Sequence, residues 1–168
     1  MKKKQRLLFI GEGETESKLI NSIFEGKCKI FNLAQNDISK IIRTIPKANE
    51  VTIYLMIDTD VLSNSKQLEC LIKNIEYLKK MKYSFFILQQ KGDLEDELAR
   101  ACSCSIKDLL RYTQCSSKSE LKSKFIKNPS CVFSHQNFDP NKLWSQQLID
   151  SLQQYSDYQA SAAVLIQK

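Results

Sequence analysis

Residues 51–60 read Val-Thr-Ile-Tyr-Leu-Met-Ile-Asp-Thr-Asp, an unbroken apolar and β-branched run that ends in two aspartates. A continuous run of this kind is typical of a strand that is buried on both faces, as in a parallel sheet. Weaker strand-like runs lie on either side of it, and amphipathic segments separate them. The pattern predicts strands at 6–10, 27–33, 51–57 and 83–88, with helices at 15–25, 37–45 and 65–81. This alternation favours an α/β fold with about four mostly parallel strands, flanked by helices and joined by right-handed crossovers.

The chain becomes helical in character after Gly92. Amphipathic patterns predict helices at 93–102, 106–112, 119–126 and 139–155. Asp139 is expected to cap the last of these helices, with Pro140 in its first turn. Since 168 residues are the size of one domain, we expect an α/β core at 1–100 and a helical extension at 101–168 packed on the same domain.

The composition is that of a globular protein, with 42% hydrophobic and 26% charged residues. No apolar stretch approaches the ~20 residues of a membrane-spanning helix. The run at 7–10 is too short for the core of a signal peptide, so we expect a cytoplasmic protein that has no membrane partner. The six cysteines include no Cys-x-x-Cys pair and are expected to be reduced thiols. The spacing of Cys102, Cys104, Cys115 and His135 matches no structural zinc site.

Acidic residues gather directly after three of the predicted strands. Nine of the nineteen lie there: Glu12, Glu14 and Glu16 after the first strand, Asp58 and Asp60 after the third, and Asp93, Glu95, Asp96 and Glu97 after the fourth. In a parallel α/β sheet, ligands bind beyond the carboxyl ends of the strands, so these acids meet at one edge if the strands are neighbours. Carboxylates packed together repel one another unless a hard cation such as Mg²⁺ joins them. Because the net charge is still +6, the rest of the chain is basic, which suits a protein that binds polyanions.

Other interpretations fit parts of this pattern. The sequence Gly-Glu-Gly at 11–13 is similar to a dinucleotide fingerprint, but Glu16 takes the third glycine position and the glutamates would repel a pyrophosphate. The chain has no Gly-Lys-Ser/Thr sequence and so no P-loop. Asp-x-Asp alone also occurs in phosphatases with an aspartyl nucleophile and in metal-dependent glycosyltransferases. Compensation of the helix dipole would account for Glu14, Glu16, Asp93 and Glu95. It accounts poorly for Glu12 and for the aspartates at 58–60.

Two stretches carry a resemblance to a known family. They are Leu-Leu-Phe-Ile-Gly-Glu-Gly-Glu-Thr-Glu at 7–16 and Ile-Tyr-Leu-Met-Ile-Asp-Thr-Asp at 53–60. A strand that ends in Glu-Gly and a later strand that ends in Asp-x-Asp resemble the Toprim domain of topoisomerases, bacterial primases, recombination proteins and a group of nucleases. With Leu-Glu-Asp-Glu-Leu at 94–98, the chain is more similar to the overcoming-lysogenisation-defect (OLD) nucleases and related phage-defence Toprim proteins. The resemblance covers about residues 5–100.

The resemblance implies a role for each matching acid. Glu12 corresponds to the Toprim glutamate that binds metal or transfers protons, and Asp58 and Asp60 correspond to the aspartates that hold Mg²⁺. Glu16 and Glu95 match the further acids of the nuclease branch, in which two metals are expected. The implied site binds one or two Mg²⁺ or Mn²⁺ ions on these five acids, with Glu12, Asp58 and Asp60 as the catalytic residues.

The nuclease branch also uses a lysine, C-terminal to the acids, to steady the phosphate. The candidates for binding nucleic acid are Lys118, Lys122, Lys124 and Lys127, and a solvated helix face explains these lysines equally well. The ATPase domain that precedes Toprim in the OLD nucleases has no counterpart in this sequence. Two expectations follow: either this chain acts alone, or a separate protein supplies the ATPase as a partner.

Two functions follow from these observations. The first is a Mg²⁺-dependent Toprim-type nuclease or phosphodiesterase that acts on nucleic acid, with DNA favoured over RNA, in phage defence or DNA processing. The second is a non-catalytic Toprim-like module that binds nucleic acid or a partner. Three of the four glycines lie at the expected site, because Gly11 and Gly13 flank Glu12, and Gly92 precedes Asp93. Glycine at such positions indicates a tight turn or a close approach of the backbone to a phosphate.

Overall fold

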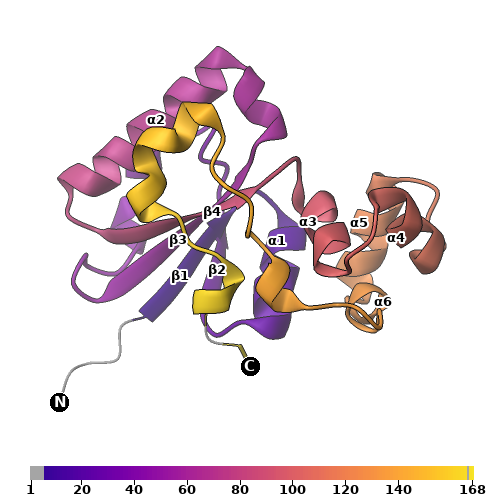
Figure 1. The fold of residues 1–168 in the computed structure, drawn as a ribbon. Helices are drawn as coiled ribbons and strands as arrows, with labels where there is room; N and C mark the ends of the chain where they lie inside the picture. The colour runs from indigo at the N-terminus through magenta and orange to yellow at the C-terminus, as the bar shows by residue number, and fades with distance from the viewer. Residues whose placement is uncertain (1–5, 166) are drawn as a thin grey trace.

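The computed structural model describes residues 6–165, 167 and 168 (Figure 1). Within this part of the chain, four strands form one sheet in the order β2-β1-β3-β4, and all neighbouring strands are parallel. The strands are β1 (Arg6–Gly11), β2 (Lys27–Ile30), β3 (Val51–Asp58) and β4 (Ser84–Gln90). The predicted fold class, an α/β fold with a four-stranded parallel sheet flanked by helices, is therefore confirmed.

Helices cover both faces of the sheet (Figure 1). The α-helices of the described residues are α1 (Glu14–Ile23), α2 (Ser65–Lys80), α3 (Leu94–Ala101), α4 (Ile106–Thr113), α5 (Lys118–Lys127) and α6 (Ser130–Phe133). α1 and α3 pack on one face with α4 to α6 beyond them, whereas α2 packs on the other face. The first five of these helices lie where the sequence predicts them, and the short α6 does not appear in the prediction.

The sheet separates two hydrophobic cores, because alternate residues of a strand point to opposite faces. Phe9, Tyr54 and Leu88 lie in the core beneath α1 and α3. Ile53 and Ile87 lie in the core beneath α2. β3 is buried along almost its whole length, as its continuous apolar run predicts.

The predicted helix at 139–155 is wrong. Asp139 caps a single 3-10 turn and Pro140 opens it, as expected, but Trp144 adopts a left-handed backbone with a φ of 56° and the helix does not continue. Trp144 is fully buried, with its ring centroid 5.6 Å from that of Phe24. Tertiary packing therefore overrides local helix propensity here. The chain continues with two short 3-10 helices, Asp150–Tyr158 and Ala162–Val164.

The segment 143–165 runs from one core to the other and covers the edge of the sheet at β4. Ala160 donates its N–H to the carbonyl oxygen of Ile87 at 2.9 Å. The ring of Tyr158 stacks on that of Phe85, with 4.5 Å between the centroids. Figure 1 shows the yellow helix of this segment beside α2. Residues of this segment thus contribute to both cores.

The predicted helix at 37–45 is replaced by two short 3-10 turns. Asp37 caps the first turn, as expected. The buried side chain of Asn74 in α2 fixes this loop, because it accepts a hydrogen bond from the N–H of Ile38 at 2.8 Å and donates one to the carbonyl oxygen of Leu33 at 2.7 Å. These bonds hold the backbone out of the sheet, and β2 is shorter than predicted.

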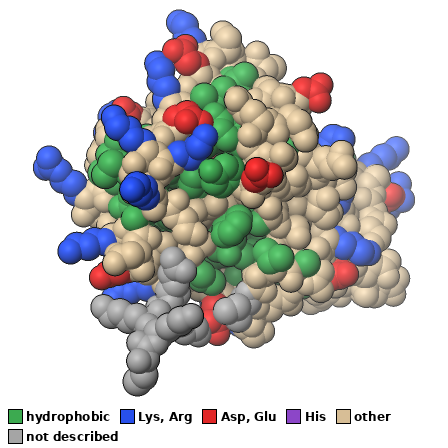
Figure 2. Space-filling model, turned by 60° about the vertical axis from the view of Figure 1, so that its left-hand side comes forward, with side chains coloured by type: hydrophobic (Ala, Val, Ile, Leu, Met, Phe, Trp, Pro, Cys, Tyr) green, Lys and Arg blue, Asp and Glu red, His purple; other side chains and the backbone are tan. Residues whose placement is uncertain are grey.

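Three further features concern hydrophobicity, the cysteines and the surface charge. No helix of the described residues is both long and apolar enough to cross a membrane. The six cysteines are all free thiols. Figure 2 shows the side of the molecule that lies on the left of Figure 1, where lysine and arginine side chains are separated by acidic and apolar ones. Among the described residues seen on this side, the basic side chains form no continuous surface for a polyanion.

Candidate metal centre

The three acid-bearing strand ends lie side by side at the carboxyl edge of the sheet. β1, β3 and β4 are consecutive in the strand order, so the adjacency on which the predicted site depends is confirmed. Asp58, the last residue of β3, is paired in register with Gln90, the last residue of β4. Glu12 follows β1 directly, and Glu95 lies in the first turn of α3.

Asp58 has a strongly perturbed carboxyl group. Burial and the neighbouring carboxylates raise the pKa of Asp58 to about 9. After burial, the largest contributions come from Glu16 and Glu12, followed by Asp60 and Asp93. A carboxyl in this setting keeps its proton at neutral pH unless a cation replaces that proton. These acids therefore behave as one electrostatic unit.

Glu12 and Glu95 share this environment. Burial is the main cause that raises the pKa of each, and Glu16 raises both further. Lys122 on α5 opposes the rise at both groups, which places its ammonium group within electrostatic reach of the cluster. Glu95 is only 5% exposed, and its Oε1 has no hydrogen-bond partner. A buried carboxylate oxygen without a donor is unusual in a folded protein, and it leaves this oxygen of Glu95 free to accept a ligand.

Glu16 is held in place at the start of α1. It is buried, and its Oε2 accepts a hydrogen bond from the N–H of Gly13 at 3.1 Å. This bond caps the helix, so the capping and dipole interpretation explains part of the acidity here. Gly11 permits the close approach, because a Cβ at that position would lie 2.8 Å from the Cβ of Glu16.

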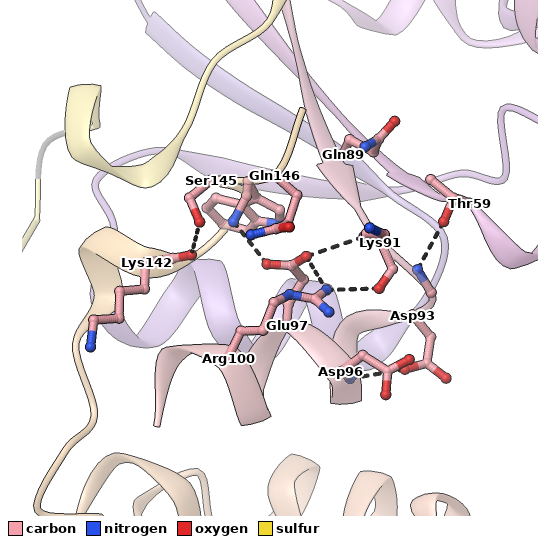
Figure 3. Close-up of polar contacts among 12 residues, drawn as sticks. Thr59, Gln89, Lys91, Asp93, Asp96, Glu97, Arg100, Lys142, Ser145 and Gln146 are labelled. Carbon is pink, nitrogen blue, oxygen red and sulfur yellow. Dashed lines mark hydrogen bonds and ion pairs between the residues drawn. The ribbon is translucent and has the colours of Figure 1, made fainter. Parts of the chain in front are cut away.

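Three other acids at this edge are neutralised by basic side chains. Nζ of Lys118 on α5 lies 2.9 Å from Oδ2 of Asp93 and 2.8 Å from Oδ1 of Asp96. Burial raises the pKa of Asp93, but the hydrogen bonds from Lys118 and Asp96 and the charge of Lys118 together outweigh it, and the pKa is lowered overall. Glu97 is fully buried and paired with Arg100 (Figure 3). Of the nine acids at this edge, those that form no ion pair with another described residue are Glu12, Glu14, Glu16, Asp58, Asp60 and Glu95; Glu14 is exposed, and the other five make up the candidate metal centre.

Thr59, the middle residue of Asp-Thr-Asp, joins the ends of β3 and β4 (Figure 3). Its N–H donates to the carbonyl oxygens of Gln90 at 3.0 Å and of Gly92 at 3.1 Å. Its hydroxyl oxygen accepts the N–H of Gly92 at 2.8 Å. These bonds fix the two aspartates relative to the first turn of α3. The Asp-x-Asp pattern allows any residue at the middle position, so the motif alone does not predict the role of Thr59.

The four lysines predicted to bind nucleic acid all belong to α5 but have different surroundings. Lys118 is paired with α3, and Lys124 donates to the carbonyl oxygen of Thr113. Lys127 lies in the last turn, exposed, about half a turn around the helix from Lys118. Lys122 is exposed and beside the acids. Of the four, Lys122 is therefore the one placed to meet a phosphate at the cluster.

A small pocket opens beside the cluster. Its lining includes Glu12, Asn32, Met56 and Asp58, and its empty volume of about 260 Å³ is partly open to solvent. No three His, Cys, Asp or Glu side chains of residues 6–165, 167 and 168 form a preformed cation site. A cation would therefore draw the carboxylates together from positions in which they now repel one another.

Gly92→Ala is expected to destabilise the protein, whereas Gly13→Ala is expected to change its stability little. Gly92 has a φ of 91°, and an added Cβ would overlap the carboxylate of Asp96. Gly13 has an extended backbone with a φ of −149°, and an added Cβ would make an ordinary contact with Glu16 at 3.4 Å. We expect a loss of about 1–3 kcal/mol for Gly92→Ala, measured by urea denaturation.

The same pair of variants tests how glycine is used at this edge. The structure requires glycine at Gly92 and favours it at Gly11, but gives no conformational reason for it at Gly13. A tight turn therefore explains glycine at position 92 but not at Gly13, where a close approach of the backbone to a phosphate stays a prediction. Equal denaturation midpoints for Gly92→Ala and Gly13→Ala would contradict this assignment.

Comparisons of the chain with protein-family models, curated proteins and solved structures find no match. The Toprim resemblance accordingly depends on the sequence motifs. The arrangement of the acids at the sheet edge is independent of that resemblance and stands on the structure.

Proposed function

We propose that this protein is a Mg²⁺-dependent nuclease of Toprim type that hydrolyses phosphodiester bonds in nucleic acid. The observation that carries the proposal is a group of carboxylates at the sheet edge that form no ion pair within the described chain and lie beside an exposed lysine. The group consists of Glu12, Glu16, Asp58, Asp60 and Glu95, and the lysine is Lys122. Self-repelling carboxylates next to a cationic side chain suit a divalent cation and a phosphate between them.

The donor set fits Mg²⁺ or Mn²⁺. All its members offer carboxylate oxygens, the ligands that these hard cations prefer. The unpartnered Oε1 of Glu95 is available to such an ion. Asp58 would release its proton when the ion binds, so affinity rises with pH. When bound, the cation activates water and stabilises the charge that develops on the attacking and leaving oxygens.

The chain's own residues supply the rest of the chemistry in this proposal. Glu12 is exposed at the edge, and burial of part of its side chain together with Glu16 raises its pKa, so it holds a proton closer to neutral pH than an ordinary glutamate. It is therefore suited to transfer a proton to or from a reacting oxygen. Lys122 would neutralise a phosphate oxygen without reading the base sequence.

Sequence-independent binding agrees with the charge distribution. The net charge is +6, although the five carboxylates of the candidate metal centre gather at one edge. The remaining basic side chains would hold a nucleic-acid backbone through contacts that weaken with salt. The proposal extends to a separate ATPase partner and to a role in phage defence, and both of these parts rest on the resemblance alone.

Cleavage of supercoiled plasmid DNA and of single-stranded RNA, each with Mg²⁺ or Mn²⁺, tests the proposal. We expect the wild type to cleave at least one substrate and Asp58→Ala to lower the rate by a factor of about 100 or more. Lys122→Met should lower the rate by a factor of about 10–100, because one phosphate contact is lost. Lys127→Met, on another side of the same helix, is the matched control and should retain the wild-type rate.

Two outcomes would refute the nuclease proposal. One is the absence of cleavage with every substrate and ion, and the other is cleavage that survives Asp58→Ala. Salt-dependent binding of nucleic acid without cleavage would instead support the non-catalytic module. A loss in Lys127→Met as large as in Lys122→Met would show that α5 acts only through its total charge.

A further inference from the structure

Gln90 is a fully buried amide without a hydrogen-bond partner, next to the candidate metal centre. It is the last residue of β4 and is 0% exposed. Neither Oε1 nor Nε2 of its side chain has a partner. Buried amides are nearly always hydrogen-bonded, because an unsatisfied one loses the bonds that water provides in the unfolded chain. Both polar atoms of this side chain are therefore available to bind a ligand that is not part of the described chain.

The neighbouring Gln89 shows that the fold satisfies a buried amide where it is structural. Gln89 is also fully buried, but it points to the opposite face of the sheet. Its Nε2 donates to the carbonyl oxygen of Gln147 at 2.7 Å, and its Oε1 accepts the N–H of Ile149 at 2.8 Å. These two bonds anchor the C-terminal segment. Gln90 has the same side chain and the same burial, yet it has neither kind of partner.

The register of the sheet places Gln90 beside Asp58. The two residues are paired on neighbouring parallel strands, so their side chains leave the same face with Cβ atoms ~5 Å apart. This face is covered by α1 and α3, whose first turns carry Glu16 and Glu95. Oε1 of Glu95 is likewise buried and unpartnered. Two elements, β4 and α3, thus direct unsatisfied polar groups to the same edge as Asp58.

We propose that Gln90 belongs to the metal centre, with its side-chain carbonyl as a neutral oxygen donor to the cation and its N–H as a donor to the carboxylate of Asp58. Glutamine carbonyl oxygens bind hard divalent cations. Hydrogen bonds to ligating carboxylates fix their orientation. A neutral donor adds a ligand without adding to the repulsion among five carboxylates. This inference rests on the proposed metal-dependent function but concerns the binding of the cation and not hydrolysis.

Gln90→Met and Gln89→Met form a matched pair, measured by melting temperature without added cation and by calorimetric titration with Mn²⁺. We expect Gln90→Met to melt no earlier than the wild type, because an apolar side chain of similar size replaces an unsatisfied amide. Its affinity for Mn²⁺ should fall by a factor of about 10–100. Gln89→Met should melt at a lower temperature than the wild type, because the carbonyl oxygen of Gln147 and the N–H of Ile149 lose their partner. It should bind Mn²⁺ with the affinity of the wild type.

Gln90→Glu provides a second variant that restores an oxygen donor. It should bind Mn²⁺ at least about 10-fold more tightly than Gln90→Met, whereas a purely structural amide would not be rescued by a carboxylate. The inference is overturned if Gln90→Met binds Mn²⁺ as tightly as the wild type, or melts as early as Gln89→Met. It is also overturned if Gln90→Glu regains no affinity or if the wild type binds no cation. Mn²⁺ binding by a wild type that cleaves no nucleic acid would refute the proposed function alone.

Discussion

Asp58→Asn is expected to raise the stability of the cation-free protein while abolishing its response to Mg²⁺ and its cleavage of nucleic acid. The carboxyl of Asp58 has a pKa of about 9 in the folded protein, because burial and then Glu16 and Glu12 disfavour its charged form. An aspartate of the unfolded chain ionises near pH 4. Asparagine has nearly the same shape but no charge, so the variant removes repulsion from the cluster and also removes a cation ligand.

The sign of the pH dependence follows from these two values. Between about pH 4 and about pH 9, the folded state keeps a proton on Asp58 that the unfolded state has released. The folded state therefore binds more protons, and the free energy of unfolding falls as pH rises through this window. The contribution is fully present below about pH 4 and is lost as pH rises through about 9. Asp58→Asn has no carboxyl at this position, so its free energy of unfolding lacks this dependence on pH.

Melting temperatures near pH 5 and near pH 9, each with and without Mg²⁺, check this expectation. Because solvent screens a partly exposed carboxyl, we expect Asp58→Asn to gain only about 1–2 kcal/mol near pH 9, or about 3–6 °C. Mg²⁺ should raise the melting temperature of the wild type and leave that of Asp58→Asn unchanged. Asp157→Asn, at an exposed aspartate of the C-terminal segment, is the control and should follow the wild type. Parallel pH profiles for the wild type and Asp58→Asn would contradict the assignment.

The edge where these acids meet could be predicted because its signals are local. The apolar run at 51–57 indicates burial on both faces, and the alternation of strands and helices restricts the sheet to parallel pairing. Acids that directly follow such strands therefore lie at the carboxyl edge of the sheet. The positions of Glu12 and Asp58 at that edge follow from neighbouring residues in the sequence, without knowledge of the tertiary structure.

The division of the acids into paired and unpaired groups could not be predicted. Asp93 and Glu95 look alike in the sequence, but Asp93 meets Lys118, which is 25 residues away along the chain. That contact depends on how α5 packs across α1 and α3. The unsatisfied state of Gln90 likewise depends on everything that surrounds it. The sequence shows which residues carry a charge or an amide group. Which of them form an ion pair or a hydrogen bond depends on how the chain folds.

The C-terminal segment was mispredicted for a related reason. Its pattern at 139–155 is apolar at helical spacing, but the apolar residues go to two different cores. Trp144 lies in the core beneath α1 and α3, and Leu148 and Leu152 lie in the core beneath α2. One straight helix cannot reach both cores, so the chain bends at Trp144, where a bulky residue takes a left-handed backbone.

Glu97 of α3 stabilises that bend and is expected to contribute more to stability than the other acids of α3. Its Oε2 accepts the N–H of Trp144 at 2.9 Å and its Oε1 accepts the N–H of Lys91 at 3.1 Å (Figure 3). It is also paired with Arg100, which donates to the carbonyl oxygen of Lys91 at 2.7 Å. One buried carboxylate thus joins the end of β4, α3 and the C-terminal segment.

Glu97→Ala should lower the free energy of unfolding by about 3–5 kcal/mol, because it leaves the buried N–H of Trp144 and the partly buried N–H of Lys91 unpaired and removes the carboxylate partner of Arg100. Trp144 is the only tryptophan of the chain, so urea denaturation followed by its fluorescence reports on the same junction. We expect a lower midpoint and, in native buffer, an emission spectrum shifted to longer wavelength as the segment loosens. Glu69→Ala, which removes an exposed ion pair with Lys73, is the control and should change neither quantity appreciably. If both variants denature at the wild-type midpoint, the segment is held by its apolar packing alone, and the charged junction at Glu97 is dispensable.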